Sequence, residues 1–181
     1  MAYDLTQLKF HGDDVVISDL AEIRRPHLVS VGNHAAIDSF VSIATGAEIG
    51  DYVHISPHVS VIGGATGLLR MGHFTNLAAG CRIICGSDEF LGYGLIGSAA
   101  IPVDYRDKMK VAPVTLVNFA NIGSNAVIMP GVTLGEGSVV AACTFVNRDT
   151  EPWTIYAGVP ARPIKLRRRD LMLAHAKSLG Y

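Results

Sequence analysis

The sequence has few charged residues and no long apolar run. Charged side chains make up 17% of the 181 residues, and the formal net charge is −1. This balance argues against nucleic acid as a partner, because binding to a phosphate backbone relies on an excess of Lys and Arg. No apolar run reaches the roughly 18 residues that a transmembrane helix needs. The N-terminus lacks a basic region followed by an apolar one, so we expect no signal peptide.

Cysteine is also scarce. The three cysteines are Cys81, Cys85 and Cys143. An odd number without metal-ligand spacing indicates free thiols in a reducing compartment, so we expect a cytoplasmic protein. Hydrophobic residues, in contrast, make up 49% of the chain. With so few charges, this composition favours a continuous apolar interior and a buried interface between subunits.

Aliphatic residues recur every six positions along two parts of the chain, with a small or β-branched residue four positions after each of them. The aliphatic positions are Val31, Ile37, Ile43, Ile49, Ile55, Val61, Met71, Leu77, Ile83, Leu116, Ile122, Ile128, Leu134, Val140 and Val146. The small positions are Ala35, Val41, Ala47, Val53, Val59, Ala65, Thr75, Cys81, Ser87, Ala120, Ala126, Val132, Ser138, Thr144 and Thr150.

A period of six fits neither an α-helix nor an ordinary strand, and it predicts a parallel β-helix. Each hexad forms a short strand and a turn, with the aliphatic and the small residue pointing inward. Three hexads close one triangular coil, and coils stack at the usual strand spacing of about 4.8 Å. We therefore predict an all-β protein with about six triangular coils, because fifteen consistent positions are unlike chance alternation in a half-buried sheet.

The repeat also predicts the domain organisation. We expect a β-helix domain over 1–163, in which 1–30 form an N-terminal arm and cap. A Gly-rich insertion at 63–67 bulges from a corner, either as a surface loop or as a wall of the substrate site. Residues 89–113 abandon the repeat but remain apolar, so we expect an ordered excursion that packs on a neighbouring subunit and shapes the active site. A C-terminal helix within 164–181 is expected to cap the last coil.

Two segments in the last part of the chain resemble the galactoside, maltose and xenobiotic O-acetyltransferases. They are IGSNAVIMPGVTLG at 122–135 and YAGVPARPIK at 156–165. The resemblance implies a left-handed β-helix, a homotrimer, and acetyl-coenzyme A as donor in a groove between two subunits, without a metal. It also implies that two residues contact the pantetheine arm and that three cations meet the phosphates or adenine. These are Ser124 and Ala142, and Arg148, Arg162 and Lys165.

A closer resemblance covers most of the chain. GSDEF at 86–90, the Ile101-Pro102 that follows, and EPWTIYAGVP at 151–160 resemble a branch that acts in surface-polysaccharide synthesis. That branch includes acyltransferases of dTDP-4-amino-4,6-dideoxyglucose and O-antigen O-acetyltransferases. The resemblance implies transfer of acetyl to a hydroxyl or an amine of a sugar, either nucleotide-linked or part of a glycan precursor.

The sequence leaves the identity of the general base open. The galactoside and maltose enzymes have a His where this sequence has Asp88. An imidazole titrates near pH 6.5 and suits a general base, whereas a carboxylate titrating near about 3.9 is a weak one. Three explanations fit: burial raises the pKa of Asp88, another residue is the base, or the acceptor is an amine that needs less activation. Asp88 is alternatively a turn-capping carboxylate.

Histidines offer the other candidates. Counting eighteen residues per coil puts residue 89 over residue 71, which brings His73 beside Asp88 as a base with its orienting carboxylate. His54 ends another hexad and could face the groove of a neighbouring subunit, and His58 is a third possibility. For each histidine, an ordinary surface role is the competing interpretation.

Three other functions are known for, or compatible with, the predicted fold. The same fold carries zinc carbonic anhydrases, but His54 and His58 lack a convincing third ligand. Acetylation of a small xenobiotic or an amino acid fits the same chemistry as sugar acetylation. A non-catalytic scaffold is the alternative outside enzymes, and the cations expected to bind phosphate argue against it.

Overall fold

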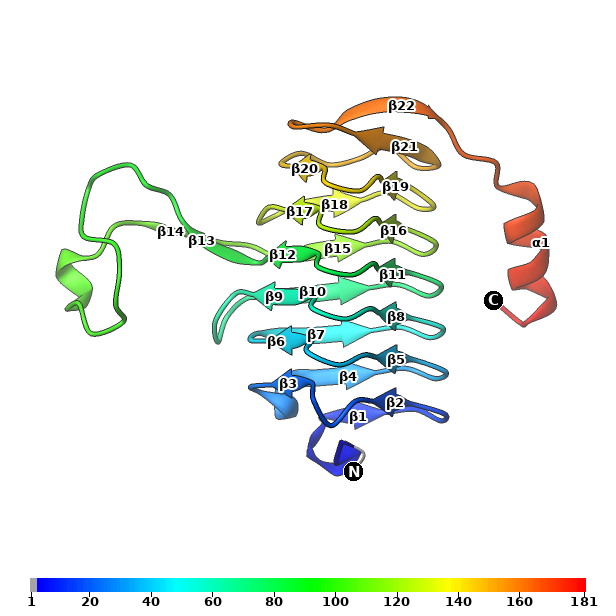
Figure 1. Ribbon diagram of the computed structural model, residues 1–181, viewed down its shortest axis with the longest axis horizontal. Helices are drawn as coiled ribbons and strands as arrows, with labels where there is room; N and C mark the ends of the chain where they lie inside the picture. Colours follow the sequence, from blue (N-terminus) through cyan, green and yellow to red (C-terminus); the bar gives the residue numbers. More distant parts are fainter. Residues whose placement is uncertain (1–2) are drawn as a thin grey trace.

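Residues 3–181, described in a computed structural model, form a left-handed parallel β-helix of about seven turns (Figure 1). A β-hairpin excursion leaves one side of this solenoid, and the helix α1 (Asp170–Ser178) lies on the opposite side. The first two residues, on which the signal-peptide expectation partly depends, lie outside the described part of the chain. No helix of residues 3–181 has the length and apolar character needed to span a membrane.

Three sheets form the faces of the solenoid, and each turn contributes one short strand to each sheet. The first sheet contains β1 (Phe10–His11), β4 (Val29–Val31), β7 (Gly46–Ile49), β10 (Leu68–Met71), β15 (Val114–Leu116) and β18 (Thr133–Leu134). The second sheet contains β2 (Val16–Ile17), β5 (Ala36–Ile37), β8 (His54–Ile55), β11 (Asn76–Leu77), β16 (Asn121–Ile122), β19 (Val139–Val140), β21 (Thr154–Ala157) and β22 (Arg162–Leu166).

The third sheet contains β3 (Glu22–Ile23), β6 (Ser42–Ile43), β9 (Ser60–Ile62), β12 (Arg82–Ile84), β17 (Val127–Ile128) and β20 (Phe145–Val146). All pairs within the turns are parallel and in register, so each aliphatic position stacks on the one in the next turn, as Ile37 does on Ile55. This stacking buries one continuous column of side chains along the axis.

The core confirms the predicted repeat in most positions. All fifteen aliphatic positions are buried, and so are thirteen of the fifteen small positions. The two exceptions are Ala65, which is exposed in the turn of the 63–67 insertion, and Ser87, which lies in the excursion hairpin. Both interruptions shift the count, and Leu69 and Val114 fill the interior in their place.

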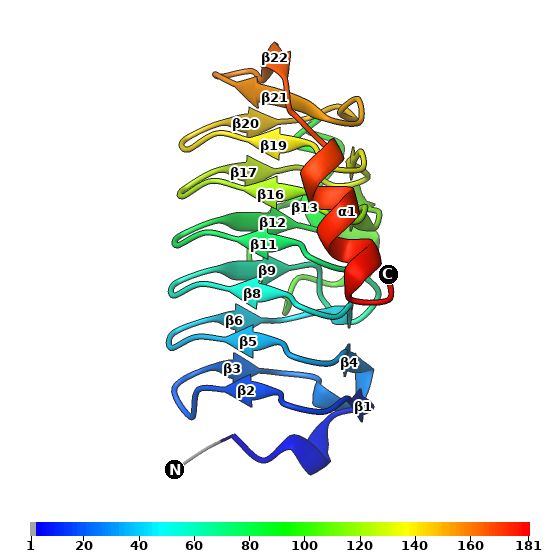
Figure 2. The same ribbon diagram turned by 90° about the vertical axis from the view of Figure 1, so that its right-hand side faces the viewer.

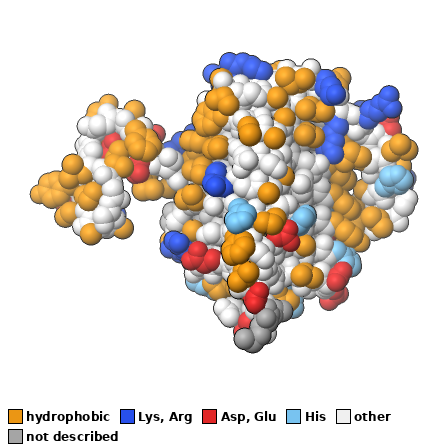
Figure 3. Space-filling model, in the orientation of Figure 1, with side chains coloured by type: hydrophobic (Ala, Val, Ile, Leu, Met, Phe, Trp, Pro, Cys, Tyr) orange, Lys and Arg blue, Asp and Glu red, His pale blue; other side chains and the backbone are white. Residues whose placement is uncertain are grey.

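The excursion is an antiparallel hairpin with a looped tip. Its strands are β13 (Gly86–Asp88) and β14 (Met109–Val111), and a short 3₁₀ helix, η3 (Val103–Tyr105), lies in the tip. The hairpin therefore begins slightly before the predicted start at 89. In the space-filling view the tip stands away from the solenoid and carries mainly hydrophobic side chains (Figure 3).

The two ends of the chain differ in how they cover the solenoid. At the N-terminal end, η1 (Leu5–Gln7) precedes a first turn that contains β2, β3 and η2 (Pro26–Leu28). The prediction that the C-terminal helix caps the last coil is wrong. The antiparallel pair β21–β22 lies over the top, and α1 runs down the side of the solenoid (Figure 2).

This packing predicts a graded reactivity of the three thiols. Cys143 is exposed, whereas Cys81 and Cys85 are fully buried. Burial raises the pKa of the Cys85 thiol to about 11, which further slows its reaction. We expect one thiol to react with iodoacetamide at pH 8 in the native protein and three after unfolding, as counted by mass spectrometry. Rapid native labelling of Cys85 would contradict the fold.

Candidate functional site

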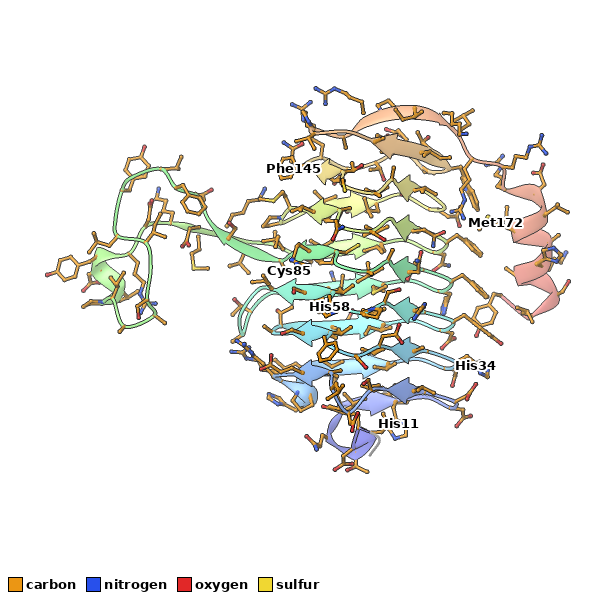
Figure 4. All side chains as sticks on the ribbon, in the orientation of Figure 1. His11, His34, His58, Cys85, Phe145 and Met172 are labelled. Carbon is orange, nitrogen blue, oxygen red and sulfur yellow. The ribbon has the colours of Figure 1, made fainter. Side chains whose placement is uncertain are left out.

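Most of the predicted site residues lie at the three corners where the sheets meet, and His54 and Lys165 lie in strands of the second sheet. We call the corner under α1 the helix corner; it includes residues 51–52 and 73–74. The corner from which the hairpin leaves is the excursion corner, with residues 85–113, 129–131 and 147–149. The remaining corner, with residues 57–58, 124–125 and 142–143, is the third corner. Strands of the third sheet run from the third corner to the excursion corner, where Cys85 marks the start of the hairpin (Figure 4).

Asp88 lies at the base of the excursion. It is half-buried and opposite Met109 in the β13–β14 hairpin. A cavity of about 330 Å³ is lined by Asp88 together with the side chains Phe90, Lys110 and Met129 among others. Asp88 also lines a second cavity of about 240 Å³ that the tip of the excursion encloses. A carboxylate is thus accessible to a ligand at the excursion corner.

His73 lies at the helix corner. Its Nδ1 accepts a hydrogen bond of 3.0 Å from the backbone N–H of Asp51, and its ring contacts Tyr181 at 5.0 Å between centroids. An imidazole that accepts at Nδ1 carries its proton on Nε2, so neither nitrogen of this tautomer is free to take a proton from an acceptor. The contacts of His73 with Asp51 and Tyr181 therefore hold the helix corner together and do not suit a general base.

The predicted proximity of His73 to Asp88 is wrong. Met71 pairs with Leu116 in the next turn, not with residue 89, because the excursion interrupts the eighteen-residue count. Residue 88 is instead in the hairpin at the excursion corner, on the side of the solenoid opposite α1 (Figure 1). Within one chain, Asp88 and His73 are on different corners.

His54 lies on the outer face of the second sheet. Its Nε2 is 2.8 Å from Oδ2 of Asp38, and half of its side chain is exposed. His58, at the third corner, stacks on Phe40 with the ring planes within 10° of each other. The structure does not bring either histidine to Asp88. Residues 3–181 contain no group of three His, Cys, Asp or Glu side chains placed to hold a metal ion.

The residues expected to bind the donor flank the upper part of the third sheet. Ser124 and Ala142 lie in consecutive turns of the third corner, joined by a hydrogen bond of 2.8 Å from Cys143 N–H to Ser124 O. Arg148 follows β20 at the other end of the same sheet, and it lines a cavity of about 300 Å³ with Arg162. Lys165 pairs with Ile155 in β22 and does not line this cavity.

An aromatic column at the helix corner escaped the sequence reasoning. One ring from each of five turns stacks on the next, with centroids 4.7–5.8 Å apart. The rings belong to His34, Tyr52, Phe74, Phe119 and Trp153. The signal was present, since four of these rings follow an aliphatic position by three residues and Trp153 follows Thr150 by three. Nothing in the repeat indicated that the rings would stack.

The segment around α1 is attached to this column. The guanidinium of Arg167 donates to the backbone oxygen of Phe119 at 2.8 Å and to Oδ1 of Asn121 at 2.9 Å. Met172 and Ala176 of α1 pack on the rings. At the end of the segment, the hydroxyl of Tyr181 donates to Oδ2 of Asp51 at 2.8 Å. Within the basic run at 165–169, Arg167 therefore attaches the C-terminal segment to the solenoid.

The Tyr181 bond predicts a pH-dependent contribution to stability. The bond raises the pKa of Tyr181 to about 12. Burial raises the pKa of Asp51, but the hydrogen bonds from Asn33 and Tyr181 outweigh burial and lower it. A raised phenol pKa stabilises the fold below the ordinary Tyr pKa of about 10 and is lost as the pH rises through 12. A lowered carboxyl pKa stabilises the fold above about 3.9 and is lost as the pH falls.

We therefore expect Tyr181→Phe to lower the thermal midpoint between pH 5 and 9. The difference from the parent protein should shrink as the pH rises from about 10 to about 12, where the unfolded phenol ionises before the folded one. It should also shrink below about pH 4, where the unfolded Asp51 carboxyl takes up its proton before the folded one. Thermal scans by circular dichroism across this range measure it, with Tyr105→Phe in the excursion as a control. A difference that stays constant from pH 5 to 12 would rule out this hydrogen bond as its source.

Known proteins resemble this chain over different lengths. The family described as "Bacterial transferase hexapeptide (six repeats)" matches residues 113–148. A dTDP-4-amino-4,6-dideoxy-D-glucose acyltransferase of Escherichia coli is 29% identical over 89% of this chain and 83% of its own length. Galactoside acetyltransferase shares the fold, with a TM-score of 0.57 and 18% identity over 90% of this chain and 66% of its own.

The solved structures of AntD, an N-acyltransferase from Bacillus cereus, are similar over the whole chain. One of them superposes with a TM-score of 0.91 and 32% identity, and covers 99% of this chain and 97% of AntD. The superposition therefore takes in nearly every residue of both chains. With its buried six-residue repeat and this full-length similarity, the chain belongs to the hexapeptide-repeat acyltransferase family.

Proposed function

We propose that this protein transfers a short acyl group, such as acetyl, from its coenzyme A thioester to the amino group of a nucleotide-linked sugar. The observation that carries the proposal is the full-length likeness to AntD, which has been solved with dTDP-4-amino-4,6-dideoxyglucose and coenzyme A, and with dTDP and 3-hydroxybutyryl-CoA. The name of the E. coli relative indicates the same class of acceptor. Surface-polysaccharide synthesis in the cytoplasm is the setting that fits such an acceptor.

The upper part of the third sheet fits the donor. The extended pantetheine arm carries amides that can pair with backbone groups at the Ser124 and Ala142 turns. Arg148 and Arg162 line one cavity at the other end of that sheet, so their charges can meet the phosphates of coenzyme A together. Lys165 lies on another face, and we expect it to reach a donor bound by a neighbouring subunit.

Asp88 fits an amine acceptor better than a hydroxyl. A hydroxyl needs a base that removes its proton during attack, whereas a neutral amine attacks with its lone pair and loses a proton afterwards. Among residues 3–181, no histidine lines either cavity beside Asp88. A carboxylate that accepts a hydrogen bond from the amine is sufficient to orient it. AntD has also been solved with an aspartate replaced by asparagine or by alanine.

The proposed step is direct transfer. The amine nitrogen attacks the thioester carbonyl carbon, the C–S bond breaks, and the proton lost by nitrogen goes to the departing thiolate. Backbone N–H groups along the groove stabilise the oxyanion that develops on the carbonyl. Asp88 holds the amine in line for attack, and His54 is the remaining candidate for a base supplied by a neighbouring subunit.

We further propose a homotrimer with active sites between subunits. Seven large apolar side chains of the excursion are more than half exposed in the single chain, which is unusual for a surface that meets only water. They are Phe90, Leu91, Tyr93, Leu95, Val103, Tyr105 and Met109. Contact with a neighbouring subunit would cover them and would bring a second chain to the cavity beside Asp88.

The trimer predicts a native mass three times the 19.2 kDa of the chain in size-exclusion chromatography with light scattering. Val103→Asp should lower that mass, since it would place a charge in the interface. Leu20→Asp, which changes a large apolar side chain that is also more than half exposed but lies on the first turn, is the control and should keep the mass. A parent protein with the mass of one chain would contradict the assembly.

Replacement of Asp88 tests the site. We expect Asp88→Asn to lower kcat about 10- to 100-fold, because the neutral amide no longer orients the amine as a carboxylate does. His73→Ala should leave kcat within about twofold, because its Nδ1 is engaged with the backbone. Thiol release from acetyl-coenzyme A, measured with nucleotide-linked amino sugars and with plain sugars, reports the rates.

Each outcome of this assay assigns a function. Turnover of amino sugars alone supports N-acyl transfer. Turnover of hydroxyl acceptors alone contradicts the amine proposal and directs the search for a base to His54. No turnover with bound coenzyme A would indicate a longer acyl donor or a polymeric acceptor, and no binding of coenzyme A would favour a scaffold.

A further inference from the structure

The excursion hairpin and its tip carry three cations, two of which have partners. Arg106 donates to the backbone oxygens of Ile101 and Ala99, both at 2.6 Å, so its guanidinium holds the tip together. Lys108 has its ammonium 5.3 Å from the centre of the Tyr93 ring, a cation–π contact. The ammonium of Lys110 has no hydrogen bond, ion pair or ring contact within the described part of the chain. Lys110 is therefore the cation of this segment that is available to a ligand.

Lys110 is held at the same cavity as Asp88. The two residues come from paired strands, with Lys110 opposite Ser87 and Asp88 opposite Met109. Both line the cavity of about 330 Å³ at the base of the excursion, together with the turn at Met129 and Pro130. Asp88 and Lys110 thus line the same cavity from opposite strands of the hairpin.

The next turn of the solenoid leaves room for the lysine side chain. Gly131 has a φ of 86°, and a Cβ built there would be 3.8 Å from both Cε and Nζ of Lys110. The end of the side chain therefore lies over the backbone of this turn, within ordinary van der Waals contact of it. A lysine ammonium is a compact point charge on a flexible stem, which suits contact with a phosphate group.

We propose that Lys110 binds the diphosphate of a nucleotide-linked acceptor and so makes the enzyme select such sugars over free ones. This inference rests on the proposed function. Such an acceptor carries an amine at one end of its sugar and a diphosphate at the other. Asp88 and Glu89 suit the amine, but they repel a diphosphate unless a cation stands nearby, and Lys110 supplies that charge.

Coenzyme A is the other source of phosphate in this reaction. Its phosphates are matched by Arg148 and Arg162, which line a separate cavity at the top of the excursion corner. Lys110 does not line that cavity, and Arg148 does not line the one beside Asp88. The two phosphate-bearing ligands therefore have different cations, and this separation makes the inference testable.

The first experiment measures binding of dTDP to the full-length protein by isothermal titration calorimetry. Loss of one charged contact should raise the Kd of Lys110→Ala about tenfold, while Lys110→Arg stays within about threefold of the parent. Lys108→Ala removes the same charge from the same hairpin outside this cavity, so we expect its Kd to match that of the parent. Circular dichroism melts verify that each variant is folded.

The second experiment separates the two phosphate sources by steady-state kinetics. Lys110→Ala should raise the KM for the nucleotide-linked amino sugar about tenfold and leave the KM for acetyl-coenzyme A and the rate with a free amino sugar unchanged. A higher KM for acetyl-coenzyme A alone would overturn the inference, and so would an unchanged Kd for dTDP. If the parent protein neither binds dTDP nor acylates any nucleotide-linked sugar, the proposed function itself fails.

Discussion

The in-register stacking of parallel strands at one coil spacing of about 4.8 Å is the constraint on which the rest of this structure depends. Each residue on the interior must fit the residue one turn above and one turn below, as the column through Ile37 and Ile55 does. This requirement fixes a six-residue pattern, buries the column completely and leaves little freedom within the three faces. The chain can vary only where it turns.

The consequence for function is that chemistry gathers at the corners. The faces offer side chains at fixed spacing, whereas a corner accepts an insertion without disturbing the stacked strands. The excursion at 86–111 is such an insertion, and it carries Asp88 and Lys110 to a cavity at its base. In the function proposed above, the donor extends along the axis and the acceptor is held at the base of this corner loop.

The helix corner has a different role. Its column of stacked rings provides a flat apolar strip on the outside of the solenoid, and α1 with Tyr181 covers part of it. Gly137 is part of this arrangement, since a side chain there would collide with the ring of Trp153. The bonds of Arg167 and Tyr181 to groups far apart in the sequence join the C-terminal segment to several turns at once. This corner is therefore concerned with stability, and His73 belongs to it.

Much of the fold could be predicted from the sequence because it is a local repeat. The spacing of Ile37, Ile43 and Ile49 determined the strands, the turns and the interior, and each is set by neighbours six or eighteen residues away. The excursion was recognised by the loss of the repeat, and the matches at 122–135 and 156–165 indicated the family. Handedness came from that resemblance, since the spacing of residues does not distinguish the two hands.

Only the tertiary structure decided how the corners are occupied. Counting along the chain put His73 beside Asp88, but an insertion of unknown geometry changes which turns stack, and the two lie on different corners. The same applies to Lys110, whose place opposite Ser87 follows from a hairpin pairing that no period in the sequence reveals. The position of α1 along the side depends on the stacked rings, a surface that exists only once the turns from His34 to Trp153 are in place. The sequence by itself determined the six-residue repeat of strands and turns. The tertiary structure decided which residues lie beside the insertion at 63–67 and the excursion, because those contacts join residues that no local pattern relates.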